Sequence, residues 1–242
     1  MYFTGIGTVA NTLAVFVGGV AGLLLKRGLK EDFQQSMMKV LGLAVIFLGM
    51  AGALTGLLQI NDDGSIQIKG TMLMIISLTL GMIAGELLHI EDHMDSLGEK
   101  IKKALGAQED KKFVEGFVTN ALVICVGAMA VVGSLQDGLA KDPSMLYAKA
   151  ILDAMITMVF AASMGIGAIA AAIPLAVYQG SITLLAGFIE PYLTEAVISD
   201  LSYIGSILIT ATGINLLFGK TIKVGNMLPA LIMVLIFRTW LT

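Results

Sequence analysis

Two asparagines, Asn11 and Asn120, lie within long apolar runs and could present amides inside a membrane. Asn11 shares one helical face with small residues at heptad-like steps, which are Gly7, Ala14, Gly18 and Ala21. Asn120 has an equivalent setting, with Gly116, Gly127 and Ala130. Small residues let two helices approach closely, and an amide in their contact can hydrogen-bond across it. We predict that both amides either join helices or line a pathway for a solute.

Lys149 and Asp153 are four residues apart within another apolar run, so they share a helical face and can pair. Charged side chains are costly inside a membrane and usually face the bundle interior or a water-filled cavity. Asp153 is therefore the strongest candidate for binding a cation or a proton. Two alternatives stay open. Lys149 could lie near the outer surface with its ammonium reaching water, or the pair could be purely structural.

Tyr178 and Gln179 begin a polar stretch that follows Pro174 and continues with Gly180, Ser181 and Thr183. Such a stretch can unwind within a membrane helix and expose backbone carbonyls to a solute. The alternative is a kink whose free backbone groups are satisfied by neighbouring helices. Asn215 and Asn226, near the inner ends of later runs, are two further candidates for lining a pathway.

Glu86, His89 and His93 could share one helical face, but their spacing lacks the helical H-E-x-x-H pattern and a second ligand cluster. We therefore predict no metal site. The sequence also lacks paired carboxylates within its apolar runs, a Ser or Cys nucleophile with a partner His, and a phosphate-binding loop. We predict no enzymatic activity and no cofactor.

Long hydrophobic runs must position these residues. The chain has 242 residues, is 57% hydrophobic and 14% charged, and has a mean hydropathy of +0.88. About 20 apolar residues let a helix cross a membrane, and a helix satisfies its own backbone in lipid. We predict an all-α, polytopic membrane helix bundle with about eight spans, at 4–25, 38–59, 70–89, 115–135, 146–172, 174–190, 203–218 and 224–241. Asn226, Pro229 and Arg238 interrupt the eighth, so seven spans are the alternative.

Basic residues indicate which loops face the cytoplasm, because Lys and Arg are enriched on that side. They follow the predicted first, third and seventh spans, at Lys26, Arg27, Lys30, Lys39, Lys100, Lys102, Lys103, Lys111, Lys112, Lys220 and Lys223. The other loops are mainly acidic. We therefore predict a protein of a bacterial cytoplasmic (inner) membrane with both termini outside.

Residues 90–112 are predicted to form a cytoplasmic amphipathic helix and linker. Apolar residues recur at steps of three and four between 91 and 105, and charged residues fill the other positions. This pattern is typical of a helix that lies on a membrane surface or packs on the bundle. The alternative is a docking site for a partner protein.

An internal repeat is visible in the sequence. Residues 7–18 read GTVANTLAVFVG, and residues 116–127 read GFVTNALVICVG. Because the first span would run inward and the fourth outward, the two copies would be inverted, which is a recurring plan of secondary transporters. Within one membrane domain, 1–242, we predict a 3+3 inverted repeat with units at 4–89 and 115–190, followed by two C-terminal spans at 203–241. A pseudo-two-fold axis would then bring Asn11 and Asn120 near a common centre.

Five blocks of the chain resemble a known family: GTVANTLAVFVGG, FVEGFVTNALVICVGAMAVVGSLQDGL, KAILDAMITMVFAASMGIG, PLAVYQGSITLLA and GKTIKVGNMLPAL. From about residue 4 to about 236 the chain resembles the uncharacterised bacterial YqgA/YdfK-like membrane proteins. The resemblance implies an inner-membrane protein and assigns no catalytic or binding residues.

The pattern of polar residues on small-residue faces favours a secondary transporter or channel for a small solute or ion. The alternative is a non-transporting membrane scaffold or sensor, in which the same residues only hold helices together. The expected partners are the lipid bilayer and a small solute or monovalent cation, with a homodimer as an assembly to be tested and no nucleic acid.

Overall fold

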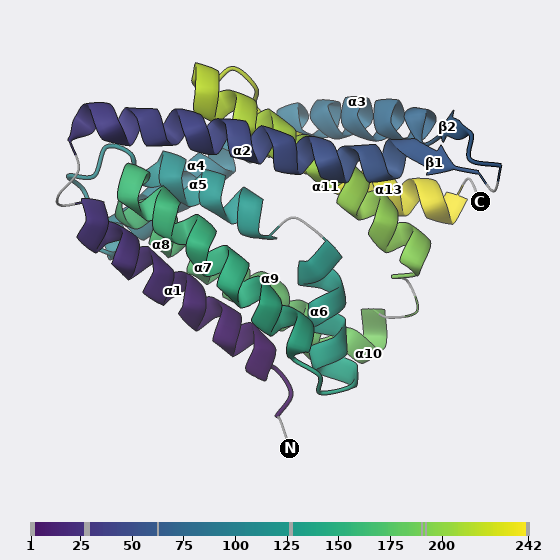
Figure 1. The fold of residues 1–242 in the computed structure, drawn as a ribbon, viewed down its shortest axis with the longest axis horizontal. Coiled ribbons are helices and arrows are strands. Elements are labelled where there is room, and N and C mark those ends of the chain that lie inside the picture. Colours follow the sequence, from purple (N-terminus) through teal and green to yellow (C-terminus); the bar gives the residue numbers. More distant parts are fainter. Residues whose placement is uncertain are drawn as a thin grey trace. The chain divides into compact units, whose positions relative to one another are not determined.

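The computed structural model describes residues 3–26, 30–61, 63–125, 128–189, 191 and 193–240. Within these residues the chain forms helices and one short hairpin (Figure 1). The elements are α1 (Ile6–Lys26), α2 (Glu31–Leu57), β1 (Leu58–Ile60), β2 (Ile66–Ile68), α3 (Thr71–Leu87), α4 (Ile90–Ala104), α5 (Phe113–Cys125), α6 (Ala128–Leu139), α7 (Ser144–Met164), α8 (Ile166–Ala170), α9 (Ala172–Leu184), α10 (Ala186–Ile189), α11 (Glu195–Phe218), α12 (Val224–Met227) and α13 (Pro229–Trp240). The predicted all-α class is confirmed.

Five helical segments are long and apolar enough to cross a membrane: Ile6–Lys26, Met38–Leu57, Ser144–Met164, Ile166–Leu184 and Glu195–Phe218. Two bent pairs, α3 with α4 and α5 with α6, raise the number to seven if each pair is one span. The predicted eighth span corresponds to a shorter apolar helix, Val224–Arg238. The described residues therefore contain five to seven candidate spans, and a count of eight is not confirmed.

The predicted boundary between the fifth and sixth spans is wrong. The sequence placed it beside Pro174, whereas α7 ends at Gly165, which has φ 93° and ψ −155°. Glycine adopts this conformation without the steric cost of a Cβ atom. Pro174 lies in the first turn of α9, where a missing N–H costs no helical hydrogen bond. The polar stretch from Tyr178 to Thr183 is therefore helical and not unwound.

The hairpin of β1 and β2 was not predicted. Its strands are antiparallel and pair Leu58 with Ile68 and Ile60 with Ile66. Gly64, between the strands, has φ 78°, a conformation that suits glycine in a turn. The second predicted span therefore ends in a strand and not in helix.

Contacts divide the chain into two compact units. Unit 1 comprises Met1–Leu41 and Asp95–Tyr192, and unit 2 comprises Gly42–Met94 and Leu193–Thr242. Neither unit coincides with the predicted repeat units at 4–89 and 115–190. The inverted repeat is not confirmed and stays a prediction, and part of the second copy, residues 126 and 127, lies outside the described residues.

In unit 1, α1 packs along α7 (Figure 1). A Cβ atom on Gly18 would lie 2.3 Å from the Ala154 carbonyl oxygen, and one on Gly22 would lie 2.1 Å from the Met158 carbonyl oxygen. Both distances are too short for any side chain, so the two backbones meet at glycines four residues apart, a common membrane packing motif. The predicted small-residue face of α1 is thus a helix contact, and it includes Gly22 in addition to the predicted Gly18.

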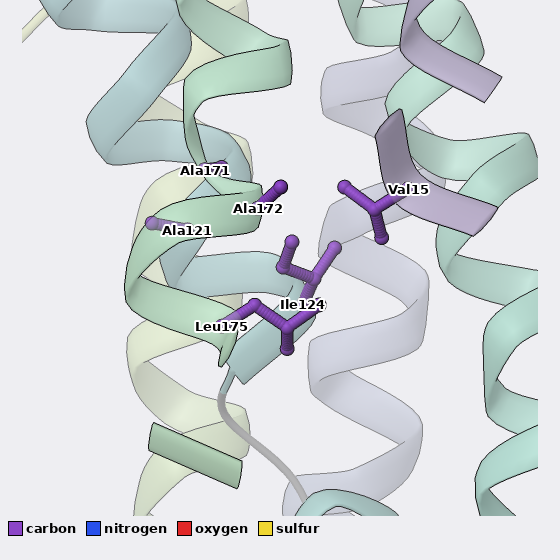
Figure 2. Packing of buried hydrophobic residues seen from close by; sticks show 6 residues of the cluster. All are labelled: Val15, Ala121, Ile124, Ala171, Ala172 and Leu175. Carbon is purple, nitrogen blue, oxygen red and sulfur yellow. The ribbon is translucent and has the colours of Figure 1, made fainter. Parts of the chain in front are cut away.

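An apolar cluster forms part of the core of unit 1. It joins α1, α5 and α9 and the residue between α8 and α9 through the buried residues Val15, Ala121, Ile124, Ala171, Ala172 and Leu175 (Figure 2). Val15 is one turn after Asn11 on α1, and Leu175 is one turn before Gln179 on α9. The cluster therefore borders the polar residues described below.

In unit 2, α3 packs against α12 and α13. A Cβ atom on Gly81 would lie 2.4 Å from the Ala230 nitrogen, and one on Gly85 would lie 1.9 Å from the Asn226 carbonyl oxygen. These glycines are again four residues apart. Both units therefore use the same small-residue packing, which is the expected way to join helices in lipid.

Helix α4 (Ile90–Ala104) lies within the segment predicted to form an amphipathic helix and linker. In unit 1, Ile101 packs against the buried cluster of Phe113, Phe117 and Ala170, and Gly98 is buried beside Phe117. Because the chain itself covers part of the apolar face, these contacts favour a linker over a docking helix. Its cytoplasmic location stays a prediction.

Candidate functional site

A buried ion pair lies in the N-terminal half of α7. The Lys149 ammonium donates to both carboxylate oxygens of Asp153, at 2.8 and 2.7 Å from Oδ1 and Oδ2. The two side chains are only 9% and 4% exposed. The predicted pairing is confirmed, and the alternative in which the Lys149 ammonium reaches water at the membrane surface is wrong.

Lys149 makes its third hydrogen bond to the end of a helix. Its ammonium donates to the carbonyl oxygen of Ile124 at 2.7 Å. Ile124 is in the last turn of α5, where carbonyls lack helical partners and a positive charge is favoured. The axes of α5 and Met129–Leu139 of α6 differ by 63°, so the predicted fourth span is broken. This break directs a free carbonyl at the ammonium.

Asn11 and Gln179 complete the surroundings of Asp153. The Asn11 side-chain nitrogen donates to Asp153 Oδ2 at 3.0 Å and to Gln179 Oε1 at 3.2 Å. Asn11 and Gln179 are both fully buried, and their remaining atoms, Asn11 Oδ1 and Gln179 Nε2, have no hydrogen-bond partner among the described residues. A buried polar atom without a hydrogen bond raises the free energy of the folded protein. These two atoms are therefore able to bind a solute or a water molecule.

Asn120 binds the next turn of α7. Its side-chain nitrogen donates to Thr157 Oγ1 at 2.9 Å and to the Ala168 carbonyl at 2.8 Å. Thr157 is four residues after Asp153, so Asn11 and Asn120 reach side chains that are about one helical turn apart, or about 6 Å along the axis. The Oδ1 atom of Asn120 has no partner among the described residues.

Asp137 is a buried carboxylate that the sequence analysis missed. It is in α6, is fully buried, and accepts hydrogen bonds from the backbone nitrogens of Gly7 at 3.1 Å and Thr8 at 3.3 Å. A negative charge is favoured at this position because the first turn of a helix has free N–H groups. The predicted fourth span ended at residue 135, which left Asp137 in the loop that follows. Its place in the last turn of an amphipathic helix was the available signal.

Polar side chains on successive turns of three helices in unit 1 form separate hydrogen-bonded groups, which together are called the polar file. Thr8 Oγ1 lies 3.2 Å from Thr183 Oγ1, and Thr183 is one turn after Gln179 on α9. The file therefore follows three helices, as Thr8 and Asn11 on α1, Lys149, Asp153 and Thr157 on α7, and Gln179 and Thr183 on α9. Polar files of this kind in a membrane bundle can carry a proton or a small cation.

Comparison with known proteins identifies the family. The model of the family described as "Protein of unknown function (DUF554)" matches residues 6–239. The chain belongs to this family. It is 31% identical to the "Uncharacterized membrane protein YdfK" of Bacillus subtilis (strain 168) over 226 residues, which cover 93% of this chain and 92% of that protein. It is also 31% identical to the "Uncharacterized protein YqgA" of Escherichia coli (strain K12) over 232 residues, 94% of each chain.

No solved structure matches the chain. The family match confirms the resemblance that the sequence blocks indicated, and the relative named as a membrane protein agrees with the apolar helices. This DUF554 chain is therefore a helical membrane protein. The polar file therefore belongs to a membrane-embedded bundle. Buried polar groups are energetically expensive there, and they are usually paired or functional.

Not all the predicted site residues join the file. Tyr178 precedes Gln179 on α9 and is half-buried. In unit 2, Asn215 Oδ1 accepts from the backbone nitrogens of Thr221 and Ile222, and its side-chain nitrogen donates to the Ile222 carbonyl. These bonds hold the loop after α11 in place, so Asn215 has a structural role.

Asn226 is also in unit 2 and joins two helix ends. Its side-chain nitrogen donates to Glu86 Oε2 at 2.6 Å, and its Oδ1 accepts from the Glu91 backbone nitrogen at 2.8 Å. Glu86 also pairs with Lys223 at 2.6 Å. Within the residues that the structure describes, no group of three or more His, Cys, Asp or Glu side chains has the geometry to hold a metal ion.

A separate cavity of about 510 Å³ lies in unit 2. Lys69, Asp200 and Arg238 are among its lining residues, and Arg238 pairs with Asp200 at 2.5 Å. None of the eight predicted site residues lines this cavity. The predicted residues that the structure brings together are Asn11, Lys149, Asp153 and Gln179, with Asn120 one turn away.

Proposed function

We propose that this protein is a secondary transporter or channel for a small solute or ion, and that Asp153 binds it. The proposed setting is the bacterial cytoplasmic (inner) membrane, with the N-terminus outside, as the distribution of Lys and Arg favours. The proposal assigns the chain no enzymatic reaction, and a homodimer stays a prediction.

The observation that supports this function is the buried Lys149–Asp153 pair in the first half of a membrane-length helix. A buried pair is often no more stabilising than a packed apolar pair of similar volume, so stability alone is a weak reason for it. Ionisable residues inside membrane segments more commonly serve ion or proton pathways. The free oxygen of Asn11 and the free nitrogen of Gln179 add unused binding capacity beside Asp153.

The broken helix supports the same proposal. Transporter sites commonly lie where a helix is interrupted, because free carbonyls at the end of the first half can bind cations. At the end of α5, the Ile124 carbonyl binds a cationic group, the Lys149 ammonium.

The alternative is a scaffold or sensor. One observation favours it: all three donors of the Lys149 ammonium are already used, two by Asp153 and one by Ile124. In that case the pair would only fix α7 against α5. The two functions differ in what the removal of the Asp153 charge does to transport.

The test compares Asp153→Asn with Asp142→Asn in proteoliposomes. Asp142 is an exposed carboxylate in the loop before α7, bound to Ser144, so it is a matched control for the loss of one acid. Fluxes of Na⁺, K⁺ and H⁺ are measured with ion-sensitive dyes. We expect wild type and Asp142→Asn to move the same cation and Asp153→Asn to lose at least about tenfold of that flux. An unchanged flux in Asp153→Asn, or no flux in wild type, contradicts the proposal.

A further inference from the structure

Three helix ends meet around Asp137 in unit 1. Asp137 is in the last turn of α6, and its Oδ2 accepts hydrogen bonds from the backbone nitrogens of Gly7 and Thr8 in the first turn of α1. Thr8 Oγ1 lies 3.2 Å from Thr183 Oγ1, in the last turn of α9. Gly138, the next residue on α6, contacts the same end of α9, because a Cβ atom on it would lie 2.5 Å from the Thr183 carbonyl oxygen. The ends of α1, α6 and α9 therefore converge on one carboxylate.

Two buried oxygens of α6 have no hydrogen-bond partner among the described residues. They are Asp137 Oδ1 and Ser134 Oγ, and both residues are fully buried. Ser134 is three residues before Asp137, so the two side chains share one face of α6. A buried oxygen without a hydrogen bond or another ligand raises the free energy of the folded protein. Both oxygens are therefore available to a ligand at this junction.

The charge of Asp137 has no ionic partner. Within the part of the chain that the structure describes, Asp137 is bound by two backbone N–H groups and pairs with no Lys or Arg, whereas Asp153 pairs with Lys149. The start of a helix stabilises a nearby anion but does not cancel its formal charge, because the helix dipole is neutral overall. An uncompensated charge is very costly inside a membrane bundle. One monovalent cation would bring the formal charge of an ionised Asp137 to zero, and a divalent cation would leave a positive charge.

The surrounding groups also fit an inorganic cation. Carboxylate and hydroxyl oxygens are the ligands that hard cations prefer, and Asp137, Ser134, Thr8 and Thr183 are between 0% and 7% exposed. The helices around them are closely packed, since even the single carbon of a Cβ atom on Gly138 would be too near α9. Such packing favours a single-atom ion over an organic ammonium.

We propose that the oxygens around Asp137 bind one monovalent inorganic cation, Na⁺ or K⁺, at a second site distinct from Asp153. Asp137 is bound to Thr8 and Asp153 to Asn11, so the two sites are about one turn of α1 apart. Asp137 is the acid nearer the start of α1. This inference goes beyond the proposed function, because the second site needs no ion at Asp153.

The test measures cation-dependent stability of the purified full-length protein in detergent. The background is the double variant Lys149→Met with Asp153→Asn, which removes both charges of the other buried pair, so that cation dependence must come from a different site. Thermal unfolding is compared in equal concentrations of NaCl, KCl and choline chloride. A ligand that binds only the folded state raises Tm, so we expect an increase of at least about 3 °C in NaCl or KCl over choline chloride. The dependence of Tm on salt concentration gives the apparent affinity.

Two variants in this background test the site itself. Asp137→Asn keeps a side-chain oxygen for the N–H groups of α1 and removes only the charge, so the cation-dependent rise in Tm should disappear. Ser134→Ala removes one ligand and leaves the bonds to α1 intact, so the apparent affinity should fall at least about fivefold. Ser96→Ala, which removes an exposed hydroxyl from α4, is the matched control and should equal the background.

Loss of the cation-dependent rise in Asp137→Asn, with a weakened affinity in Ser134→Ala, supports the second site. An undiminished rise in Asp137→Asn overturns it, because Asp137 would then only cap α1. Equal Tm values in the three salts also overturn it and would assign the free oxygens to water. If Asp137→Asn does not fold, Ser134→Ala decides, and an unchanged affinity then contradicts the site. None of these results tests Asp153, which is judged by flux in protein that retains Asp137.

Discussion

Units 1 and 2 each contain a lysine paired with an acid and an asparagine that joins helices, yet they place them differently. In unit 1, the side chains of Lys149 and Asp153 are 9% and 4% exposed, and both residues lie in the N-terminal half of α7. In unit 2, the side chains of Lys223 and Glu86 are 57% and 51% exposed, and both residues lie at the ends of helices. The lysine–acid pair is therefore exposed to water in unit 2 and enclosed in unit 1, whereas the asparagines of both units are buried.

This difference shows that burial, and not residue type, separates the two lysine–acid pairs. An exposed ion pair contributes little because water already stabilises both charges. A buried pair loses that solvation, so each partner depends on the other or on a bound ion. Each of the following predictions tests one part of this comparison.

The largest expected effect is from Lys149→Met in cation-free buffer. This change leaves the Asp153 carboxylate buried and unpaired, which should cost about 3–5 kcal/mol of unfolding free energy and lower Tm by roughly 10 °C. Thermal unfolding in detergent, followed by circular dichroism, measures the shift. The double variant Lys149→Met with Asp153→Asn removes both charges and should recover most of the loss. Equal Tm values for wild type and Lys149→Met would mean that the pair has no energetic coupling.

The sequence predicted this pair because a spacing of four places two side chains on one helical face. It also predicted α4 and the small-residue contact of α1, since both follow from helical periodicity. It did not predict which helix would break. The polar stretch at Tyr178–Thr183 is helical, with Thr183 bonded to Thr8, whereas α5 ends at Cys125 within an apolar run. The contacts that Thr183 and Ile124 make with distant residues are not visible in a local sequence pattern.

The sequence also did not predict the buried position of Asp137 or the hairpin of β1 and β2. Asp137 was assigned to a loop because the predicted fourth span ended at residue 135. Gly7 and Thr8, which bind it, are 130 and 129 residues away in sequence. Such a distant contact is invisible without the fold. The hairpin of β1 and β2, in contrast, had a local signal in the alternation of Leu58, Gln59 and Ile60, which the high hydropathy of the preceding helix obscured.

An intermediate effect is expected when the two buried asparagines are compared. Asn120→Ala removes donors from the Ala168 carbonyl and the Thr157 hydroxyl, which are enclosed in unit 1 and have no water to replace them. The expected cost is about 1–3 kcal/mol. Asn226→Ala in unit 2 leaves the half-exposed Glu86 carboxylate free to bind water, so we expect less than about 1 kcal/mol. Denaturation of both variants under one condition gives the two values, and a larger loss for Asn226→Ala contradicts the argument from depth.

The smallest effect is expected from Lys223→Met, the unit 2 counterpart of Lys149→Met. Its partner Glu86 is half exposed, so water can replace the lost ammonium, and Tm should not change measurably at neutral pH. The hydrogen bond to Glu86 raises the pKa of Lys223 above its ordinary value of 10.5. A raised lysine pKa means that any stabilisation is fully present below pH 10.5 and is lost as pH rises through the folded value. Wild type and variant should therefore have the same pH dependence of Tm from neutral to mildly alkaline conditions, and any difference should shrink only in strong base. If Lys223→Met lowered Tm as far as Lys149→Met, exposure would not be what separates the two pairs, and the assignment of function to the unit 1 pair by depth alone would fail.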